Sequence, residues 1–210
     1  MYTLAENPIK SIKVTLQNAI NQGISYEEYR ELVHQLAVDN SNTGLEKTEA
    51  LANYTQLNDR RMKRWDKTLK VPEEMASKIK EHKKRVTWLV LTESWCGDAS
   101  PSLPVMNKLT EINPNITLKI VLRDEHPELM DRFLTHGSRS IPKLIALDSQ
   151  TQEVLGEWGP RSTKATQMVL DEKAKNGTLS AEFKQELQVF YNKDKGQDII
   201  TDLTELLALK

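Results

Sequence analysis

The stretch that decides the fold is Val86-Thr87-Trp88-Leu89-Val90-Leu91-Thr92-Glu93-Ser94-Trp95-Cys96-Gly97-Asp98-Ala99. Its apolar run from Trp88 to Leu91 is typical of a strand that is buried on both faces, as in a parallel sheet. A short polar turn follows this run and contains Cys96, the only cysteine of the chain. We therefore expect a central strand that ends beside a single thiol.

The residues after the turn indicate an amphipathic helix, because apolar side chains recur there at helical spacing: Leu103, Val105, Met106 and Leu109. Cys96 then lies where a strand ends and a helix begins. The free N–H groups and the dipole at a helix N-terminus favour a thiolate. We therefore expect the pKa of Cys96 to lie below the value of about 8.5 for a free cysteine. The carboxylates of Glu93 and Asp98 would oppose this effect if they point inward.

Three segments of the chain, in this order, resemble the thioredoxin family. The stretch from Trp95 to Ala99 is similar to the family's Trp-Cys-x-x-Cys, with Ala99 in place of the second cysteine. Residues 137–147 resemble the family's loop, cis-proline and following strand, and residues 153–159 resemble its last strand and glycine. The resemblance covers about residues 80–175. It implies an α/β protein with a thioredoxin-like fold, in which helices flank a central mixed sheet.

The family resemblance also implies the residues of the site. Cys96 is the expected catalytic residue, and the Ile141–Pro142 bond is expected to be cis. The following residues are expected to form the substrate groove and its rim: Trp95, Gly97, Asp98, Ile141 and Pro142. Arg139, three residues before the proline, is the candidate for stabilising a thiolate.

The rest of the chain predicts helical additions on both sides of this core. We expect residues 1–70 to form a helical extension packed on the core, 71–175 the thioredoxin-like domain, and 176–210 a C-terminal helical tail. The extension carries apolar stripes at helical spacing and no glycine-rich linker follows it. Its third helix is expected from about Leu45 to Lys67. A short helix is expected from Glu128 to Leu134, and the tail is expected to hold two helices, at about 180–192 and 197–209.

The missing second cysteine limits the chemistry of Cys96. A dithiol cycle needs a second thiol one helical turn away, and Ala99 cannot supply it. Three routes remain: a monothiol oxidoreductase resolved by an external thiol such as glutathione, a redox sensor, or a redox-inactive scaffold that binds a protein partner. The expected partner of the first two routes is a thiol or disulfide protein substrate, or a low-molecular-weight thiol. No cofactor is expected.

Monothiol glutaredoxins that hold an iron–sulfur cluster are a further resemblance. Their site resembles Cys-Gly-Phe-Ser, whereas this chain has Cys-Gly-Asp-Ala, which disfavours that function. We also expect no metal site, because His126 and His136 have no cysteine or histidine at metal-ligand spacing.

Composition excludes several classes of function. Charged residues make up 28% of the chain and the formal net charge is −1, so no basic excess points to nucleic acid. Local basic runs, such as residues 60–64, are interpreted as solvated helix faces. No apolar run approaches the roughly 20 residues that span a bilayer, and the N-terminus does not resemble a secretory signal. A single cysteine fits a reducing compartment, so we expect a cytoplasmic protein.

Overall fold

A computed structural model describes the backbone of residues 8–208 and the side chains from Ile12 to Ala208. Its centre is a mixed sheet of four strands in the order β2-β1-β3-β4. Strand β1 (Val86–Thr92) runs parallel to β2 (Ile116–Leu122) and antiparallel to β3 (Lys143–Asp148). Strand β4 (Val154–Trp158) pairs antiparallel with β3. This mixed sheet is the central element of the α/β fold that the sequence predicts.

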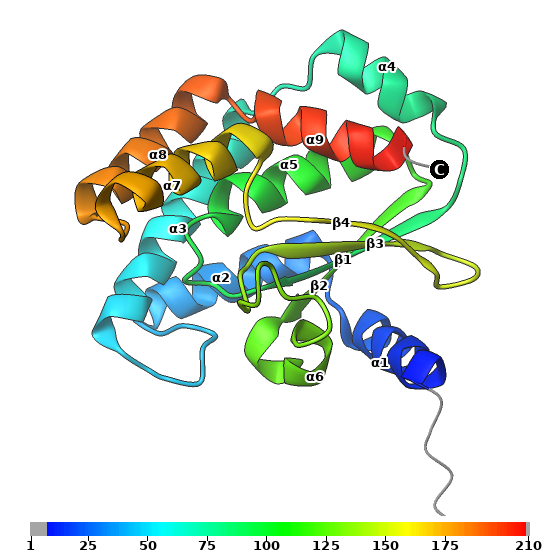
Figure 1. Ribbon diagram of the computed structural model, residues 1–210, viewed down its shortest axis with the longest axis horizontal. Coiled ribbons are helices and arrows are strands. Elements are labelled where there is room, and N and C mark those ends of the chain that lie inside the picture. The colour runs from blue at the N-terminus through cyan, green and yellow to red at the C-terminus, as the bar shows by residue number, and fades with distance from the viewer. Residues whose placement is uncertain (1–7, 209–210) are drawn as a thin grey trace, which may run out of the picture.

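Helices cover both faces of the sheet (Figure 1). On one face lie α5 (Ala99–Ile112) and α9 (Gln197–Ala208), and α4 (Glu73–Glu81) contacts both of them. The opposite face is covered by α1 (Pro8–Gln22) and α6 (Pro127–Met130). The remaining elements are α2 (Tyr26–Val38), α3 (Glu49–Thr68), the 3-10 turn η1 (Arg123–Glu125), α7 (Thr163–Asn176) and α8 (Ala181–Asp194). Helix α3 packs between α2 and α5, and α7 contacts α8 and α9.

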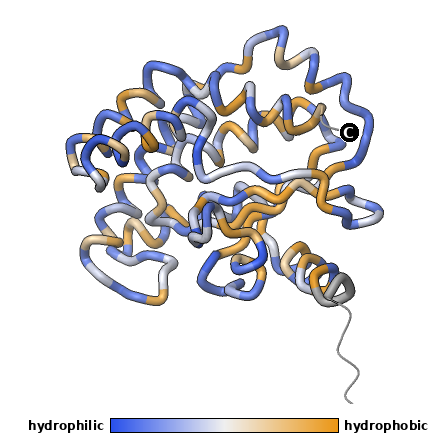
Figure 2. The backbone as a smooth tube through the Cα atoms, in the orientation of Figure 1, coloured by the Kyte–Doolittle hydropathy of each residue, from blue (hydrophilic) through white to orange (hydrophobic). Residues whose placement is uncertain are grey.

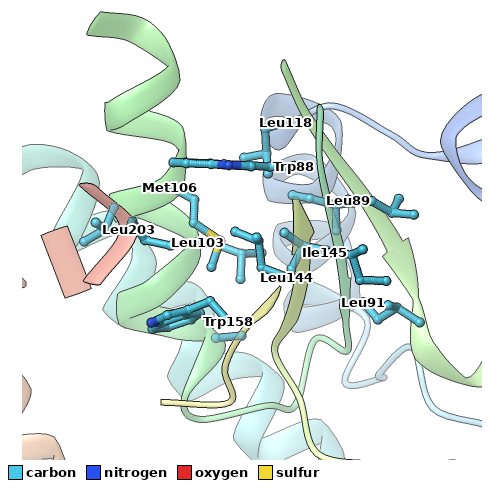
Figure 3. Packing of buried hydrophobic residues seen from close by; sticks show 14 of the residues in the cluster. Trp88, Leu89, Leu91, Leu103, Met106, Leu118, Leu144, Ile145, Trp158 and Leu203 are labelled. Atoms are coloured by element: carbon cyan, nitrogen blue, oxygen red, sulfur yellow. The ribbon is translucent and has the colours of Figure 1, made fainter. Parts of the chain in front are cut away.

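The core lies between the sheet and these two helical layers. All seven residues of β1 are buried, as the apolar run predicts. Trp88 and Leu144 point toward Leu103 and Met106 of α5, whereas Leu89, Leu91 and Ile145 point away from that helix (Figure 3). This alternation follows from the pleat of a strand, which sends successive side chains to opposite faces. Figure 2 shows the same distribution along the backbone, with apolar residues concentrated in the strands.

The helical segments on either side of residues 71–175 share this core. Leu16, Tyr29 and Val33 from the N-terminal segment belong to the same buried cluster as the sheet, and so do Ile199 and Leu203 near the C-terminus. These residues are at most 1% exposed.

Helix α2 begins directly after Ser25, which forms a capping box with Glu28. Helix α3 begins at Glu49, capped by the side chain of Thr48, rather than at Leu45. The prediction failed here because residues before Thr48 are held by contacts with a distant turn, described below.

The short helix after β2 is also shorter than predicted. It covers Pro127–Met130 rather than residues 128–134. Thr135 and Ser138 exchange two backbone hydrogen bonds of 3.0 Å, which close a tight turn. His136 and Gly137, inside that turn, have positive φ angles of 49° and 74°, so the helical conformation cannot continue through them.

Candidate active-site turn

The segment between β1 and α5 places Cys96 in a tight turn. The N–H of Cys96 donates a hydrogen bond to the carbonyl of Glu93 (3.1 Å), and the N–H of Ala99 donates to the carbonyl of Cys96 (3.2 Å). Helix α5 starts at Ala99, so the thiol precedes the helix instead of belonging to its first turn. Cys96 is only 7% exposed.

The loop before β3 brings a second predicted residue to this turn. The Cys96 thiol donates a hydrogen bond to the carbonyl oxygen of Ile141, over 3.2 Å. The Ile141–Pro142 peptide bond is cis, as is Gly159–Pro160. Because β3 pairs antiparallel with β1, the start of β3 lies beside the end of β1. Sheet pairing thus brings together two residues that are 45 positions apart in the sequence.

The expectation of a lowered thiol pKa is wrong. Burial of the thiol, together with the nearby carboxylate of Asp98, raises the pKa of Cys96 to about 12. The backbone N–H groups of Ala99 and Asp98 lower this pKa, as the position before a helix predicts, but burial outweighs them. The protonated thiol is therefore the stable form at neutral pH.

Asp98 is the buried acid of the site. Its carboxylate pairs with the guanidinium of Arg161 over 2.7 Å and accepts a hydrogen bond from the hydroxyl of Tyr191 over 3.1 Å. Burial raises the pKa of Asp98, and the Arg161 guanidinium opposes that rise. Arg161 follows β4 and Tyr191 lies on α8, so Asp98 links the active-site turn to the C-terminal third of the fold.

Arg139 lies near the site but has another partner. Its guanidinium makes two hydrogen bonds of 2.6 Å to the carboxylate of Asp131. The cation that favours a thiolate at Cys96 is instead Arg161. Sequence reasoning did not single out Arg161, because nothing in the pattern after Gly159 indicates that this side chain turns toward Cys96.

A buried polar network holds the turn from the N-terminal side. The side chain of Thr43 donates to the carboxylate of Glu93 and accepts the N–H of Ser94, and the side chain of Asn58 donates to the carbonyl of Ser94 over 2.9 Å. The backbone N–H of Asp124 donates to Glu93 over 2.9 Å. The Glu93 carboxylate is therefore occupied by its own partners. No local pattern near these residues indicates such long-range contacts.

A cleft of about 640 Å³ opens above the turn. Its walls come from α3, the turn, the loop before β3, the segment after β4 and the start of α8. The residues that line it are Leu51, Tyr54, Leu57, Arg61, Trp95, Cys96, Gly97, Asp98, Arg123, Arg139, Ser140, Ile141, Pro160, Arg161, Leu179, Ala181, Phe183, Lys184, Gln185, Leu187 and Gln188. Pro142 is buried and is not among them. The other predicted site residues all line this one cleft.

Arg61 is a cleft residue that the sequence pattern could have indicated. Tyr54, Leu57 and Arg61 follow one another at helical spacing, so they share one face of α3. The same spacing indicates that Arg61 turns toward the cleft, whereas the basic run of residues 60–64 is interpreted above as a solvated helix face.

Trp95 lies under the guanidinium of Arg123, which is 4.9 Å from the centroid of the Trp95 ring.

Residues 8–208 contain neither a metal-binding cluster nor a helix that could span a membrane. In that range no group of three or more histidine, cysteine, aspartate or glutamate side chains could hold a metal ion. None of the helices in the described range has the length and apolar character needed to cross a bilayer.

The fold and the candidate site together define a protein of thioredoxin-like fold, with a single cysteine in the turn between β1 and α5. Residues 44–180, more than half of the chain, match the sequence profile of the thioredoxin family. The chain therefore belongs to that family. The matched region begins at Gly44 and so includes all of α3. No curated protein matches the chain.

Two solved structures resemble the fold. A protein of unknown function from Pseudomonas aeruginosa has 19% sequence identity and a TM-score of 0.61, over 91% of this chain and 93% of that one. An HIV epitope scaffold has 19% identity and a TM-score of 0.55, over 88% of this chain and 98% of that one. At these identities the likeness concerns the fold alone. Its coverage extends into the helical segments at both ends.

Proposed function

We propose that this protein carries out monothiol thiol–disulfide exchange at Cys96, with a low-molecular-weight thiol as the resolving partner. The observation that carries the proposal is that Cys96 lines an open cleft beside the Ile141 peptide. A disulfide that enters the cleft therefore meets the only sulfur nucleophile of the chain. A reaction that depends on an external thiol fits the reducing cytoplasm, where such thiols are kept reduced.

The exchange balances in two steps. The Cys96 sulfur attacks one sulfur of a disulfide R–S–S–R, forms a Cys96–S–S–R bond and releases RS⁻, which takes up the thiol proton as RSH. A second thiol, R′SH, then attacks the R sulfur of the mixed disulfide and gives R–S–S–R′. The Cys96 thiolate leaves and takes up the proton of R′SH. No electrons are gained or lost overall, and the external thiol fills the role of the missing second cysteine.

The high pKa of the thiol fixes how this reaction responds to pH. Because the pKa of Cys96 is raised to about 12, its thiolate fraction, and with it the exchange rate, rises roughly tenfold per pH unit across the neutral and mildly alkaline range. The same property disfavours a peroxide sensor, since oxidation of cysteine by peroxide also follows thiolate character.

Intact-protein mass spectrometry tests the proposal. The protein is incubated with bis(2-hydroxyethyl) disulfide between pH 7 and pH 9, and we expect one adduct at Cys96 that a small thiol removes. Cys96→Ser is the control and gains no adduct. Catalysis is measured as exchange between glutathione and the same disulfide, above the rate without protein. Failure of the folded protein to form the adduct, when the urea-unfolded chain forms it readily, would contradict the proposal.

The burial of Cys96 favours a second candidate, a redox-inactive binding module. A thiol that is 7% exposed and hydrogen-bonded to a carbonyl suits a packing role as well as a chemical one. The two candidates differ in one measurement. A binding module keeps its ligand affinity in Cys96→Ser and shows no thiol turnover, whereas the enzyme loses its turnover in that variant.

A further inference from the structure

The cleft above Cys96 is lined by an excess of positive charge. Among its described lining residues, five are basic and Asp98 alone is acidic; the basic ones are Arg61, Arg123, Arg139, Arg161 and Lys184. Two of these guanidinium groups have acidic neighbours outside the cleft, since Arg123 pairs with Asp124 and Arg139 pairs with Asp131. The charge balance near Cys96 therefore depends on the remaining three.

Arg61 is a cation without an ion-pair partner in the described chain, and the carboxylate of Asp98, which pairs directly with Arg161, attracts it only from a longer distance. In the part of the chain that the structure describes, no carboxylate lies within ion-pair distance of it, and its hydrogen bond is a long one of 3.4 Å to the side-chain oxygen of Asn58. Its guanidinium stands over the active-site turn, because a methyl group placed on Gly97 would lie 3.9 Å from the Nη1 of Arg61. Partial burial, and the neighbouring charge of Arg64, lower the pKa of Arg61. A half-buried, unpaired charge of this kind is costly for the fold unless something else uses it.

Arg161 and Lys184 extend this positive surface. Arg161 pairs with Asp98 through one terminal nitrogen, but its Nε is buried without a hydrogen-bond partner among residues 12–208. Lys184, at the start of α8, has no ion-pair partner within the described chain. Since Asp98 balances one charge at most, Arg61 and Lys184 leave the cleft with a net positive charge beside the thiol.

We infer that the cleft binds a small organic anion whose carboxylate pairs with Arg61, and that the substrate of Cys96 is therefore a carboxylate-bearing disulfide or thiol of low molecular weight. The part that concerns the substrate of Cys96 rests on the proposed function, whereas the anion site does not. A guanidinium binds a carboxylate through paired N–H···O contacts, so an arginine without an ion-pair partner suits that group.

The size and lining of the cleft favour a small molecule. A volume of about 640 Å³ is in the ordinary range of small-molecule sites, which is roughly 300–1,000 Å³. Leu57, Phe183 and Leu187 provide an apolar wall, against which the carbon chain of such a ligand can pack. With the carboxylate at Arg61, above Gly97, the sulfur end of the ligand lies close to Cys96.

A charge series of disulfides tests the substrate half of the inference. The probes are 3,3′-dithiodipropionate, bis(2-hydroxyethyl) disulfide and cystamine, which are similar in length and carry negative, zero and positive charge. Mixed-disulfide formation at Cys96 is measured for each, and its rate is divided by the rate with a free thiol to remove the intrinsic reactivity of the probe. We expect the dianion to react about tenfold faster than the neutral probe, as one charged hydrogen bond provides. Equal corrected rates, or a preference for cystamine, would overturn the inference.

Two arginine variants on the same helix locate the effect. Arg61→Gln should remove most of the preference for the dianion, measured as the ratio of the corrected rates with the dianionic and the neutral probe. Arg60→Gln is the matched control, because Arg60 is an exposed neighbour that does not line the cleft. A similar loss in both variants would show a diffuse effect of net charge and would contradict a binding role for Arg61.

A binding measurement separates this inference from the proposed function. The probe is 3,3′-thiodipropionate, a thioether that carries the two carboxylates and cannot exchange with a thiol. Calorimetry or NMR titration of Cys96→Ser with this probe should show saturable binding that is weakened about tenfold when Arg61→Gln is added. Binding without thiol exchange would leave the anion site standing and refute the proposed function. No saturable binding would refute the anion site itself.

Discussion

The pH response of Cys96 gives the sharpest test of the structure. With a pKa of about 12, the thiolate fraction at pH 7 is about one in 10⁵, against about one in thirty for a free thiol of pKa about 8.5. The lower population is partly offset by the greater nucleophilicity of a more basic thiolate, which contributes about 40-fold over this pKa difference. We therefore expect Cys96 to react about a hundredfold more slowly than a free thiol at pH 7.

The same raised pKa predicts a loss of stability above pH 8.5. The unfolded chain releases the thiol proton first, so the free energy of unfolding falls as the pH rises from the unfolded value toward the folded one. Between pH 8.5 and pH 10 the expected loss is about 2 kcal/mol. Buried tyrosines such as Tyr29 also have a raised pKa, but their unfolded value is about 10, so they contribute above this window.

Two assays on one protein measure both effects. Iodoacetamide modification is followed between pH 6 and pH 11, and urea unfolding is followed over the same range for the parent chain and Cys96→Ser. The difference between the two unfolding curves isolates the thiol. A modification midpoint below pH 8.5, or unfolding curves that stay parallel above it, would refute the conclusion that burial dominates at Cys96.

Three substitutions near the turn extend this test. Asp98→Asn should lower the pKa of Cys96 and speed its modification, while the loss of a buried ion-pair partner destabilises the fold by about 3 kcal/mol in urea unfolding. In the Ala99→Cys variant, the new thiol should form a disulfide with Cys96 on mild oxidation, since a backbone hydrogen bond of 3.2 Å between residues 96 and 99 closes that turn. The variant should also reduce insulin faster than the parent. Two alkylatable thiols after oxidation would contradict the expected disulfide. Gly44→Ala should destabilise the fold by about 1–3 kcal/mol, because its new methyl would lie 2.8 Å from the Nε1 of Trp95, and an unchanged urea midpoint would argue against that packing.

The central sheet was predictable because its signals are local. The run from Trp88 to Leu91 is buried on both faces, which is the environment that four consecutive large apolar residues in a strand indicate. The start of α3 was not predictable, because Thr43 is held by hydrogen bonds to Ser94, which lies 51 residues away. A contact between residues so far apart in the sequence produces no periodic pattern near Leu45.

The sequence predicts which residues lie at the candidate site, but it does not predict the pKa of the thiol. Cys96 and Ile141 follow from the spacing of two family-like segments, and the thiol does bond to the Ile141 carbonyl. The rise of the thiol pKa depends on the burial of the thiol and on the direction of the Asp98 carboxylate. The residues near the cysteine indicate neither how deeply the thiol is buried nor which way that carboxylate points. Arg161 and Tyr191 reach the site only through the docking of the C-terminal segments, so their roles required three-dimensional information.

The backbone bridge between Ile24 and Ile120 covers part of the edge of the sheet. Strand β2 is an edge of the sheet, and such an edge can template pairing with another molecule. Ile24 exchanges two hydrogen bonds of 2.9 Å with Ile120, and the side chain of Lys119 donates to the carbonyl of Gly23 over 3.1 Å, so part of this edge is already occupied. A fragment that starts at Gly44 would lose this cover and expose an alternating apolar strand to its neighbours. The segment between α1 and α2 therefore covers part of an edge at which a strand of another molecule could otherwise pair.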